Sequence, residues 1–518
     1  MKLTQWFPIF LSLLNTSSGL SIGIPFIQQT NDEHAEEKSA ALSLETDTIV
    51  DSFFQTTPST VSTSSSSSQH KVDTKSKVST SLQTYIYNLA NDKSLQTFLT
   101  TTRRTLHQHP ELMYQESYTS ETIQNILDSL NIPYSIGWSK NTHPDRYAGS
   151  GGYGIVATIG TGSGPCVLLR ADMDALPIDE KVETAYKSHT RNKMHACGHD
   201  GHVTMLLGAA KVLKDMERSI PGTIRLVFQP AEEGGAGAKR MIEEGVLEME
   251  PKPSVAFAMH VWPTLPTGTI ASRPGPLLAA AEHFEIIVAG KGGHAAMPHL
   301  NIDPIVCSSY LVVNLQTIVS RVISPLEAGV ISVTMFSAGD AYNVIPTSAT
   351  LRGTIRALST EKLLWMRDKL EHVVHTTSSM HGCNSTIQFS PDFYPPTIND
   401  EILFESFSRE VGAMVSSSKT VQNVEPTMGG EDFAFFAQEI PSTFFLLGQG
   451  GHDDVDTMKD RHAQYMPRTD YGLHHPNFSL DENVLPIGVE LHVNLALRAI
   501  KELQSGRTFQ IETIEDEL

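Results

Sequence analysis

Short apolar segments that end abruptly in polar residues set the narrowest limits on what this chain can fold into. Helix-like patterns such as Thr204–Met216 lie between these segments, and strands that alternate with helices favour a mostly parallel sheet. In such sheets the carboxyl ends of the strands meet at one edge, where ligands bind. We therefore expect the polar segments to gather at one edge of a sheet. The apolar segments and their polar continuations are Val167–Leu169 with Arg170–Asp174, Ile224–Phe228 with Gln229–Glu233, and Val255–Met259 with His260.

Residues 282–391 show a second pattern, in which the expected order is β-α-β-β-α with a final strand. That order suits a small two-layer domain. The prediction is an α/β protein with a large domain from residues 83–281 and 392–505, whose mostly parallel sheet is flanked by helices, and an inserted smaller α+β domain. The expected elements of the inserted domain are the strands His283–Ala289, Ile331–Phe336, Thr350–Arg356 and Ser385–Phe389 and the helices Asp303–Val322 and Glu361–His375.

The N-terminal residues look like a targeting signal followed by a linker. Residues 1–19 begin with Lys2, continue with the apolar stretch Trp6–Leu14 and end in small residues, which is the order of a secretory signal peptide. Residues 20–82 are rich in Ser and Thr, and we expect a disordered linker because such a tract buries too little apolar surface to fold.

The C-terminal residues 506–518 form an acidic tail that ends in Glu515-Asp516-Glu517-Leu518. This ending resembles an ER-retrieval signal, although Glu replaces the basic first residue. With the signal peptide, it favours the ER lumen, and secretion is the alternative. No stretch after the signal peptide approaches ~18 consecutive apolar residues, so no membrane span is expected.

Charge and cysteine content exclude other classes of protein. The chain carries 38 Lys and Arg against 58 Asp and Glu, a formal net charge of −20. This balance lacks the basic surface that nucleic acids and anionic membranes require, so we expect no nucleic-acid partner. The 4 cysteines in 518 residues are too few for a disulfide scaffold.

The segment His195–His202 holds three His, one Cys and one Asp, which are donors to transition metals. A polar loop with hydrogen-bonded histidines is the alternative. The adjacent carboxylates of Glu232 and Glu233 repel each other unless a cation or a proton compensates, and an exposed acidic turn is the alternative there. His260 and His474 would each, taken alone, be ordinary structural or surface histidines.

Together these segments resemble the M20 metallopeptidase family, in its amidohydrolase branch of hippurate hydrolases, N-acyl-amino-acid hydrolases and plant indole-3-acetyl-amino-acid hydrolases. The resemblance covers roughly residues 84–505, in the family's order and spacing. The matching segments are LHQHPELMYQE (106–116), RADMDALPI (170–178), KMHACGHDGH (193–202), FQPAEEGGAGAK (228–239), GKGGHAAMPH (290–299), NVIP (343–346), GTIRA (353–357), YPPT (394–397), GGEDFA (429–434) and LHHPNF (473–478).

The resemblance implies a site with two divalent metal ions per subunit. Glu232 would be the general base and then the general acid, and Asp174 would orient a ligand. His294 would stabilise the oxyanion, often in the partner subunit's site. Asn343 and Arg356 would bind the substrate carboxylate, with Arg352 as a rival for Arg356. The implied metal ligands are Cys197, His199, Glu233, His260 and His474.

Two departures from the family pattern bear on this assignment. His475 directly follows His474, so either could be the fifth ligand, and the family register favours His474. The segment 451–471 just before it is longer and more charged than the family pattern.

The implied activity is hydrolysis of the amide bond of N-acyl amino acids, of the auxin-conjugate or hippurate type. A broad aminoacylase or a dipeptide carboxypeptidase is the rival enzyme, and a catalytically silent binding protein is the rival of another class. Manganese ranks first as the metal, with zinc or cobalt as alternatives. The inserted domain, residues 282–391, is expected to act as a lid and to form a homodimer.

Overall fold

The computed structural model describes residues 46–55, 74–451 and 467–510. The predicted signal peptide, most of the predicted linker and the retrieval-like ending Glu515–Leu518 lie outside the described residues.

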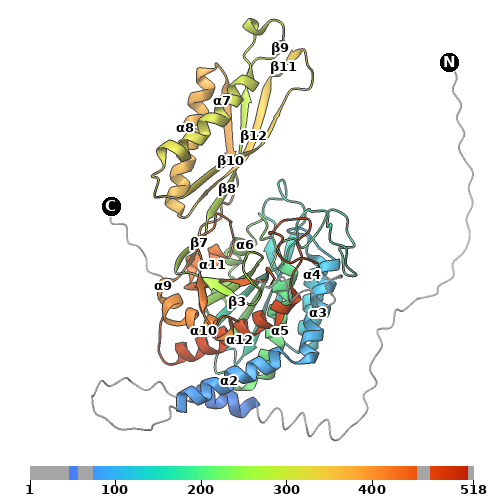
Figure 1. The fold of residues 1–518 in the computed structure, drawn as a ribbon, viewed down its shortest axis with the longest axis vertical. Helices are drawn as coiled ribbons and strands as arrows, with labels where there is room; N and C mark the ends of the chain where they lie inside the picture. Colours follow the sequence, from blue (N-terminus) through green and yellow to red (C-terminus); the bar gives the residue numbers. More distant parts are fainter. Residues whose placement is uncertain (1–45, 56–73, 452–466, 511–518) are drawn as a thin grey trace, which may run out of the picture. The chain divides into compact units, whose positions relative to one another are not determined.

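A mixed eight-stranded sheet forms the centre of the larger part (Figure 1). Of the seven pairings in the described part of this sheet, four are parallel and three are antiparallel. The four adjacent strands β4, β3, β5 and β16 are all parallel to one another, and the apolar segments had predicted the first three of them. In spatial order the strands are β1 (Tyr134–Lys140), β2 (Gly151–Gly160), β4 (Thr223–Gln229), β3 (Cys166–Asp172), β5 (Pro253–Trp262), β16 (Ser442–Gly448), β6 (Ile270–Ser272) and β15 (Val421–Asn423).

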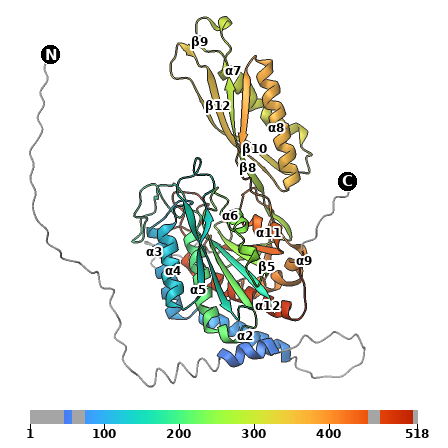
Figure 2. The same cartoon turned by 180° about the vertical axis from the view of Figure 1, so that it is seen from behind.

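Helices cover both faces of this sheet, and strand β3 shows the consequence (Figure 2). Val167 and Leu169 point into the core beneath one group of helices, whereas Leu168 belongs to the core on the opposite face. A strand covered on both faces buries every side chain, which is why the first four residues of β3, Cys166–Leu169, read as a continuous apolar run. The first group is α2 (Thr74–Ala90), α3 (Lys93–Gln108), α4 (Ser117–Ser129), α5 (His199–Asp215), α10 (Arg409–Val415) and α12 (Leu485–Gln504), and the second is α6 (Gly237–Glu243) and α11 (Ala434–Glu439).

The predicted disordered linker is wrong at two places. Residues 46–55 are helical, and helix α2 begins at Thr74, inside the range assigned to the linker. Val50 and Phe53 are buried in the core beneath α12, and the Nζ atom of Lys501 lies 4.0 Å from the centroid of the Phe53 ring. A few apolar residues at helical spacing were enough to dock this short segment, although the tract as a whole is polar.

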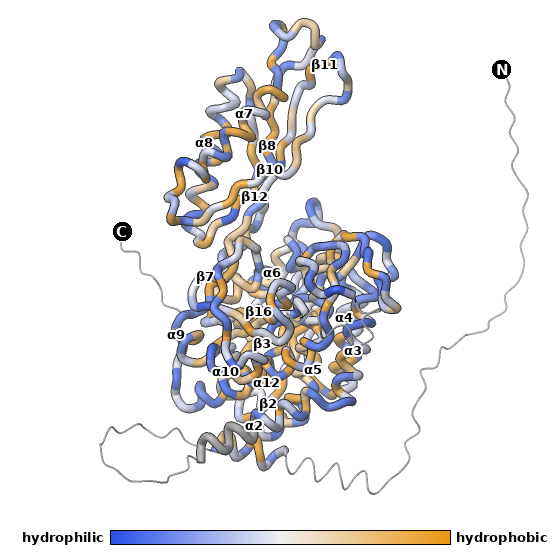
Figure 3. Tube along the Cα trace, viewed as in Figure 1, coloured by the Kyte–Doolittle hydropathy of each residue, from blue (hydrophilic) through white to orange (hydrophobic). Residues whose placement is uncertain are grey.

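The inserted residues form a four-stranded antiparallel sheet with two helices on one face. The burial of β12 alternates along the strand, as expected where only one face is covered. Figure 3 shows hydrophobic residues along the strands of this sheet and on the helices that cover it. In spatial order the strands are β10 (Gly329–Ala338), β12 (Ser348–Ala357), β8 (Ala280–Ala289) and β13 (Asn384–Phe389), and the helices are α7 (Pro304–Thr317) and α8 (Thr360–Met380).

One helix among the described residues, Pro304–Val322, is long and apolar enough to cross a membrane by length and composition alone. It contains no unbroken run of ~18 apolar residues, because polar residues such as Asn314 interrupt it. In this structure Cys307 and Leu311 of the helix pack into the core of the small sheet.

Candidate metal centre

The polar segments do meet at one edge of the large sheet. Strands β4, β3 and β5 are adjacent and parallel, so the loops after Gln229 and Asp172 and the end of β5 at His260 lie together. Helix α5 begins at His199, directly after this edge, and Gly198 before it adopts φ 89°, a conformation that favours glycine. The left-handed glycine lets the chain turn sharply, so that Cys197 and His199 both face the edge.

The five implied metal ligands form one continuous cluster. Cys197 Sγ lies 3.3 Å from His260 Nε2, and His474 Nε2 lies 3.3 Å from Glu233 Oε1. In the described part of the chain, ligand atoms within 4.8 Å of one another include the sets Cys197–His199–His260, Cys197–Glu233–His474 and His199–Glu232–Glu233. The sets share members, which is the arrangement that two neighbouring ions require.

Unsatisfied polar atoms show that the cluster fits a cation. Both ring nitrogens of His199 and Oε1 of Glu233 are buried without a hydrogen-bond partner among the described residues. Such groups are costly to bury unless a partner or an ion satisfies them. Although burial opposes it, the nearby carboxylates of Asp172 and Asp174 raise the pKa of His199 to about 10. A site that holds a proton this tightly also attracts a metal ion.

The structure favours His474 over its neighbour as the fifth ligand. The His475 ring stacks on Tyr471, with 4.7 Å between the ring centroids, and its Nδ1 accepts a hydrogen bond from the backbone N–H of Asn477. His475 is therefore engaged elsewhere, whereas His474 faces Glu233.

Glu232 and Glu233 are adjacent in sequence but differ in their protonation. Burial raises the pKa of Glu232 well above its ordinary value, and Glu431 and Glu233 raise it further. Burial acts on Glu233 as well, but His474 and His199 outweigh it and lower the pKa of that carboxyl. Without an ion, Glu232 thus tends to keep a proton and Glu233 is a carboxylate, which suits a proton carrier beside a ligand.

Two buried carboxylates hold the turn that carries this pair. Asp174 accepts hydrogen bonds from the backbone N–H groups of Glu232 and Glu233, each at 3.0 Å. Glu116 accepts one from the N–H of Ala231 at 2.9 Å. Asp174 also lies 3.4 Å from Nδ1 of His199, one of the implied ligands.

A second buried network was not predicted from the sequence. The Arg170 guanidinium contacts Asp172 at 2.6 Å, Asp432 at 2.8 Å and Glu431 at 3.0 Å. Asp172 in turn lies 2.6 Å from Nδ1 of His202. The sequence feature that could have indicated this network is the charge pattern of the segments RADMD and GGEDF, which together contain one arginine and several acidic residues.

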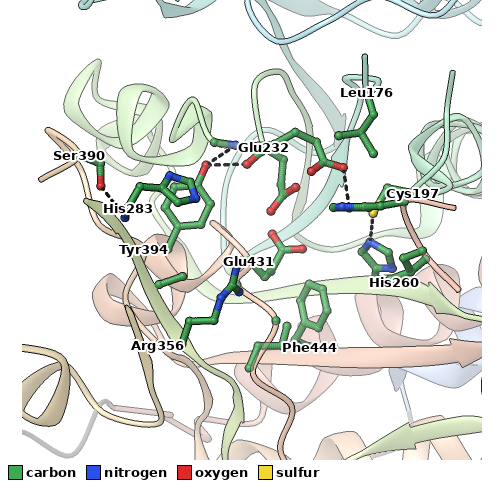
Figure 4. Close-up of a pocket in the computed structure, with 18 of the residues that line it drawn as sticks. Leu176, Cys197, Glu232, His260, His283, Arg356, Ser390, Tyr394, Glu431 and Phe444 are labelled. Carbon is green, nitrogen blue, oxygen red and sulfur yellow. Dashed lines mark hydrogen bonds and ion pairs between the residues drawn. The ribbon is translucent and has the colours of Figure 1, made fainter. Parts of the chain in front are cut away.

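A cavity of about 580 Å³ lies in front of the ligand cluster (Figure 4). Glu232 and Cys197 line one side, and Arg356 and His283 from the small sheet line the opposite side. Arg356 donates a hydrogen bond from Nη1 to the Met428 carbonyl at 2.8 Å. The apolar part of the wall consists of Leu176, Trp262, Leu278, Phe444 and Leu473.

Three of the residues considered for substrate binding do not line this cavity. His294 and Asn343 lie side by side, because the neighbouring strands β9 (Gly293–His294) and β11 (Val344–Ile345) pair, and both residues are exposed. Arg352 is also exposed, and its guanidinium contacts Glu285 at 2.5 Å. Between the two arginines, placement therefore favours Arg356 as the group that meets a substrate.

Comparison with known proteins agrees with this site. Residues 168–498 match the peptidase family M20/M25/M40. The chain is 42% identical to IAA-amino acid hydrolase ILR1-like 4 of Arabidopsis thaliana over 80% of this chain and 88% of that protein. It is 35% identical to the N-acetylcysteine deacetylase of Bacillus subtilis over 80% of this chain and 100% of that protein.

A solved structure extends the agreement to the fold. The Bacillus subtilis YXEP protein, described as a dinuclear metal binding peptidase from the M20 family, superposes with a TM-score of 0.61 at 32% sequence identity. The match covers 79% of this chain and 99% of that one. Since both its sequence and its fold match, the chain belongs to the peptidase family M20/M25/M40.

Proposed function

We propose that this protein is a metal-dependent amidohydrolase that cleaves the amide bond of N-acyl amino acids, giving a free acid and an amino acid. One observation carries the proposal: buried Glu232 stands beside the ligand cluster on one side of a cavity, and Arg356 faces it from the other. The names of the similar plant and bacterial proteins support the same reaction class.

Cys197, His199, Glu233, His260 and His474 would hold two divalent ions. When bound, such ions supply Lewis acidity and lower the pKa of water. The Cys and His donors suit zinc, but the resemblance to the auxin-conjugate branch places manganese first, with zinc or cobalt as alternatives.

Glu232 is the proton carrier of the proposed reaction. Its carboxylate takes a proton from the attacking water and then delivers it to the nitrogen of the leaving amine. The raised pKa of Glu232 suits both steps, since a base of ordinary acidity would hold the proton too weakly.

Arg356 would select substrates that carry a free α-carboxylate, because the planar guanidinium matches the geometry of that group. The apolar wall that includes Leu176, Trp262 and Leu473 would receive the acyl group. An aromatic acyl group such as indole-3-acetyl would bury the most apolar surface there.

The small sheet would complete the site through a homodimer. Residues 282–391 expose apolar side chains that include Tyr310, Val313, Met335 and Phe336, each at least 43% exposed. Covering this surface with a second copy would bring the partner subunit's His294 to the oxyanion and the partner subunit's Asn343 to the substrate carboxylate. Sedimentation velocity of the wild-type protein and of Val313→Glu checks this proposal. The wild type is expected to be a dimer and the variant a monomer, and a monomeric wild type would contradict it.

We also infer a place in the secretory pathway, with the ER lumen first and secretion second. The support is the sequence of residues 1–19 and of the ending Glu515–Leu518.

The decisive experiment measures hydrolysis of indole-3-acetyl-alanine, hippurate and a plain dipeptide by the full-length protein. The protein is first stripped of metal and then supplied with Mn²⁺ or Zn²⁺. Cleavage restored by metal is the expected result, and the ranking of substrates separates an N-acyl-amino-acid hydrolase from a dipeptidase. Tight metal binding without turnover of any substrate would contradict the proposal.

A further inference from the structure

Tyr394 lies where the chain returns from the small sheet to the large one. Its backbone pairs with that of Ala281, at the start of strand β8, through two hydrogen bonds of 2.9 Å. Ala281 also pairs with Arg356 on the neighbouring strand β12. The backbone of Tyr394 therefore belongs to the connection between the two sheets, next to the strand that carries Arg356.

The side chain of Tyr394 reaches the turn that carries Glu232 (Figure 4). Its hydroxyl donates a hydrogen bond to the carbonyl of Glu232 at 2.6 Å. The same oxygen accepts hydrogen bonds from the N–H groups of Gly234 at 2.9 Å and Ala236 at 3.0 Å. A phenol oxygen offers one donor and two acceptor positions, and all three are used.

This turn needs such support because its backbone is strained. Ala231 and Ala236 adopt φ of 58° and 56°, which L-amino acids with a side chain rarely adopt, and Gly234 has φ 105°. Asp174 and Glu116 hold the first half of the turn through the N–H groups of residues 231 to 233. Tyr394 holds the second half through the N–H groups of Gly234 and Ala236, and Asp392 of the same connection contacts Lys239 and Arg240 just beyond the turn.

We infer that Tyr394 is a positioning residue that links the connection between the two sheets to the turn carrying Glu232 and Glu233. The role in turnover rests on the proposed hydrolysis of N-acyl amino acids, whereas the role in holding the turn does not. Through this link, a movement of the small sheet that brings Arg356 onto a substrate also acts on the backbone of the proton carrier.

The variant Tyr394→Phe tests the inference, since it keeps the ring and removes only the hydroxyl. In the metal-loaded enzyme, kcat is expected to fall about tenfold, while KM and metal content stay within about twofold. Amide hydrogen exchange in residues 230–238 is expected to become faster, and this readout does not depend on any substrate.

Tyr114→Phe is the matched control. The hydroxyl of Tyr114 donates to the carbonyl of Gly235 at 2.5 Å, so this variant removes a hydrogen bond to the same turn without touching the connection. We expect a smaller loss of kcat than in Tyr394→Phe.

Each result has a definite meaning. Unchanged kcat and unchanged exchange in Tyr394→Phe would overturn the inference, as would an equal loss of kcat in the two variants. If the wild-type protein hydrolyses no N-acyl amino acid but exchange still rises in Tyr394→Phe, the proposed function fails and the link between Tyr394 and the turn stands.

Discussion

The large and the small sheet place their polar residues in opposite ways. At the edge of the large sheet, Arg170 and Asp172 are buried and held by several partners each, and Glu232 is buried on a turn whose backbone is held. On the small sheet, His294 and Arg352 are exposed. The edge of the large sheet is thus preorganised by buried contacts, whereas the small sheet contributes to the cavity through Arg356 and His283.

The largest expected effect comes from removing the proton carrier. Glu232→Gln keeps the size of the side chain but cannot accept and return a proton, so kcat is expected to fall by about 10³-fold or more. Steady-state kinetics with metal content measured on the same sample checks this. A loss below about tenfold would refute the role of Glu232 and with it the contrast between the two sheets.

The next effect concerns stability at the buried edge. Arg170→Met leaves the carboxylates of Asp172, Glu431 and Asp432 without their shared cation, so unfolding free energy is expected to fall by about 3–5 kcal/mol. Urea unfolding measures the loss.

Arg104→Met is its control, since Arg104 forms an exposed ion pair with Glu482. Removing that pair is expected to cost less than about 1 kcal/mol. Equal losses of unfolding free energy in Arg170→Met and Arg104→Met would mean that burial does not make the Arg170 network more important for stability than the exposed pair.

Arg356→Ala is expected to lower kcat/KM for N-acyl amino acids about 100-fold, because the carboxylate loses its charged partner. For the same substrates with the carboxylate converted to an amide, kcat/KM is expected to differ little between Arg356→Ala and wild type. Arg352→Ala is the matched control on the same strand and is expected to stay within about twofold of wild type. A larger loss in Arg352→Ala would reverse the choice between the two arginines.

The smallest effect is a pH dependence within the small sheet. Burial raises the pKa of Glu282 to about 7, although Arg367 opposes this from 3.1 Å. An unfolded glutamate has a pKa of about 4.3, so between roughly pH 4.5 and 7 the folded state holds a proton that the unfolded state has lost.

The free energy of unfolding therefore falls as pH rises through that window. In Glu282→Gln this decrease is expected to be smaller by on the order of 1–2 kcal/mol. Thermal unfolding at pH 5 and pH 7.5 measures it, with Glu285→Gln as the control, since Glu285 is a half-buried glutamate on the same strand. A slope that is the same in Glu282→Gln and wild type would contradict the prediction.

The sequence predicted the parallel strands and the edge where they end, because both follow from local apolar patterns. The ligand set came from the resemblance to the family, and the structure brings those five residues close together. The Arg170 network was out of reach, because its partner Asp432 lies more than two hundred residues away and only the folded sheet brings them together. The helix at 46–55 was missed for a different reason: the composition of the surrounding tract outweighed a few well-spaced apolar residues.

The grouping of His294 with Asn343 shows a further limit. Segment matching singled out both residues, and strands β9 and β11 do place them together. The fold leaves both exposed and outside the lining of the cavity beside Glu232, so their proposed roles rest on the resemblance and not on a contact in this fold.

The cluster of buried carboxyl groups has a consequence for the stability of the protein in a cell. Burial raises the pKa of Glu431 to about 7 and that of Glu232 well above its ordinary range, so a cation that binds beside them would displace protons. Because the ions bind the folded chain and not the unfolded one, they act as folding ligands whose contribution grows with their concentration. Metal supply would then govern the lifetime of the protein against unfolding and proteolysis, and cells short of the metal would lose the enzyme as well as its activity.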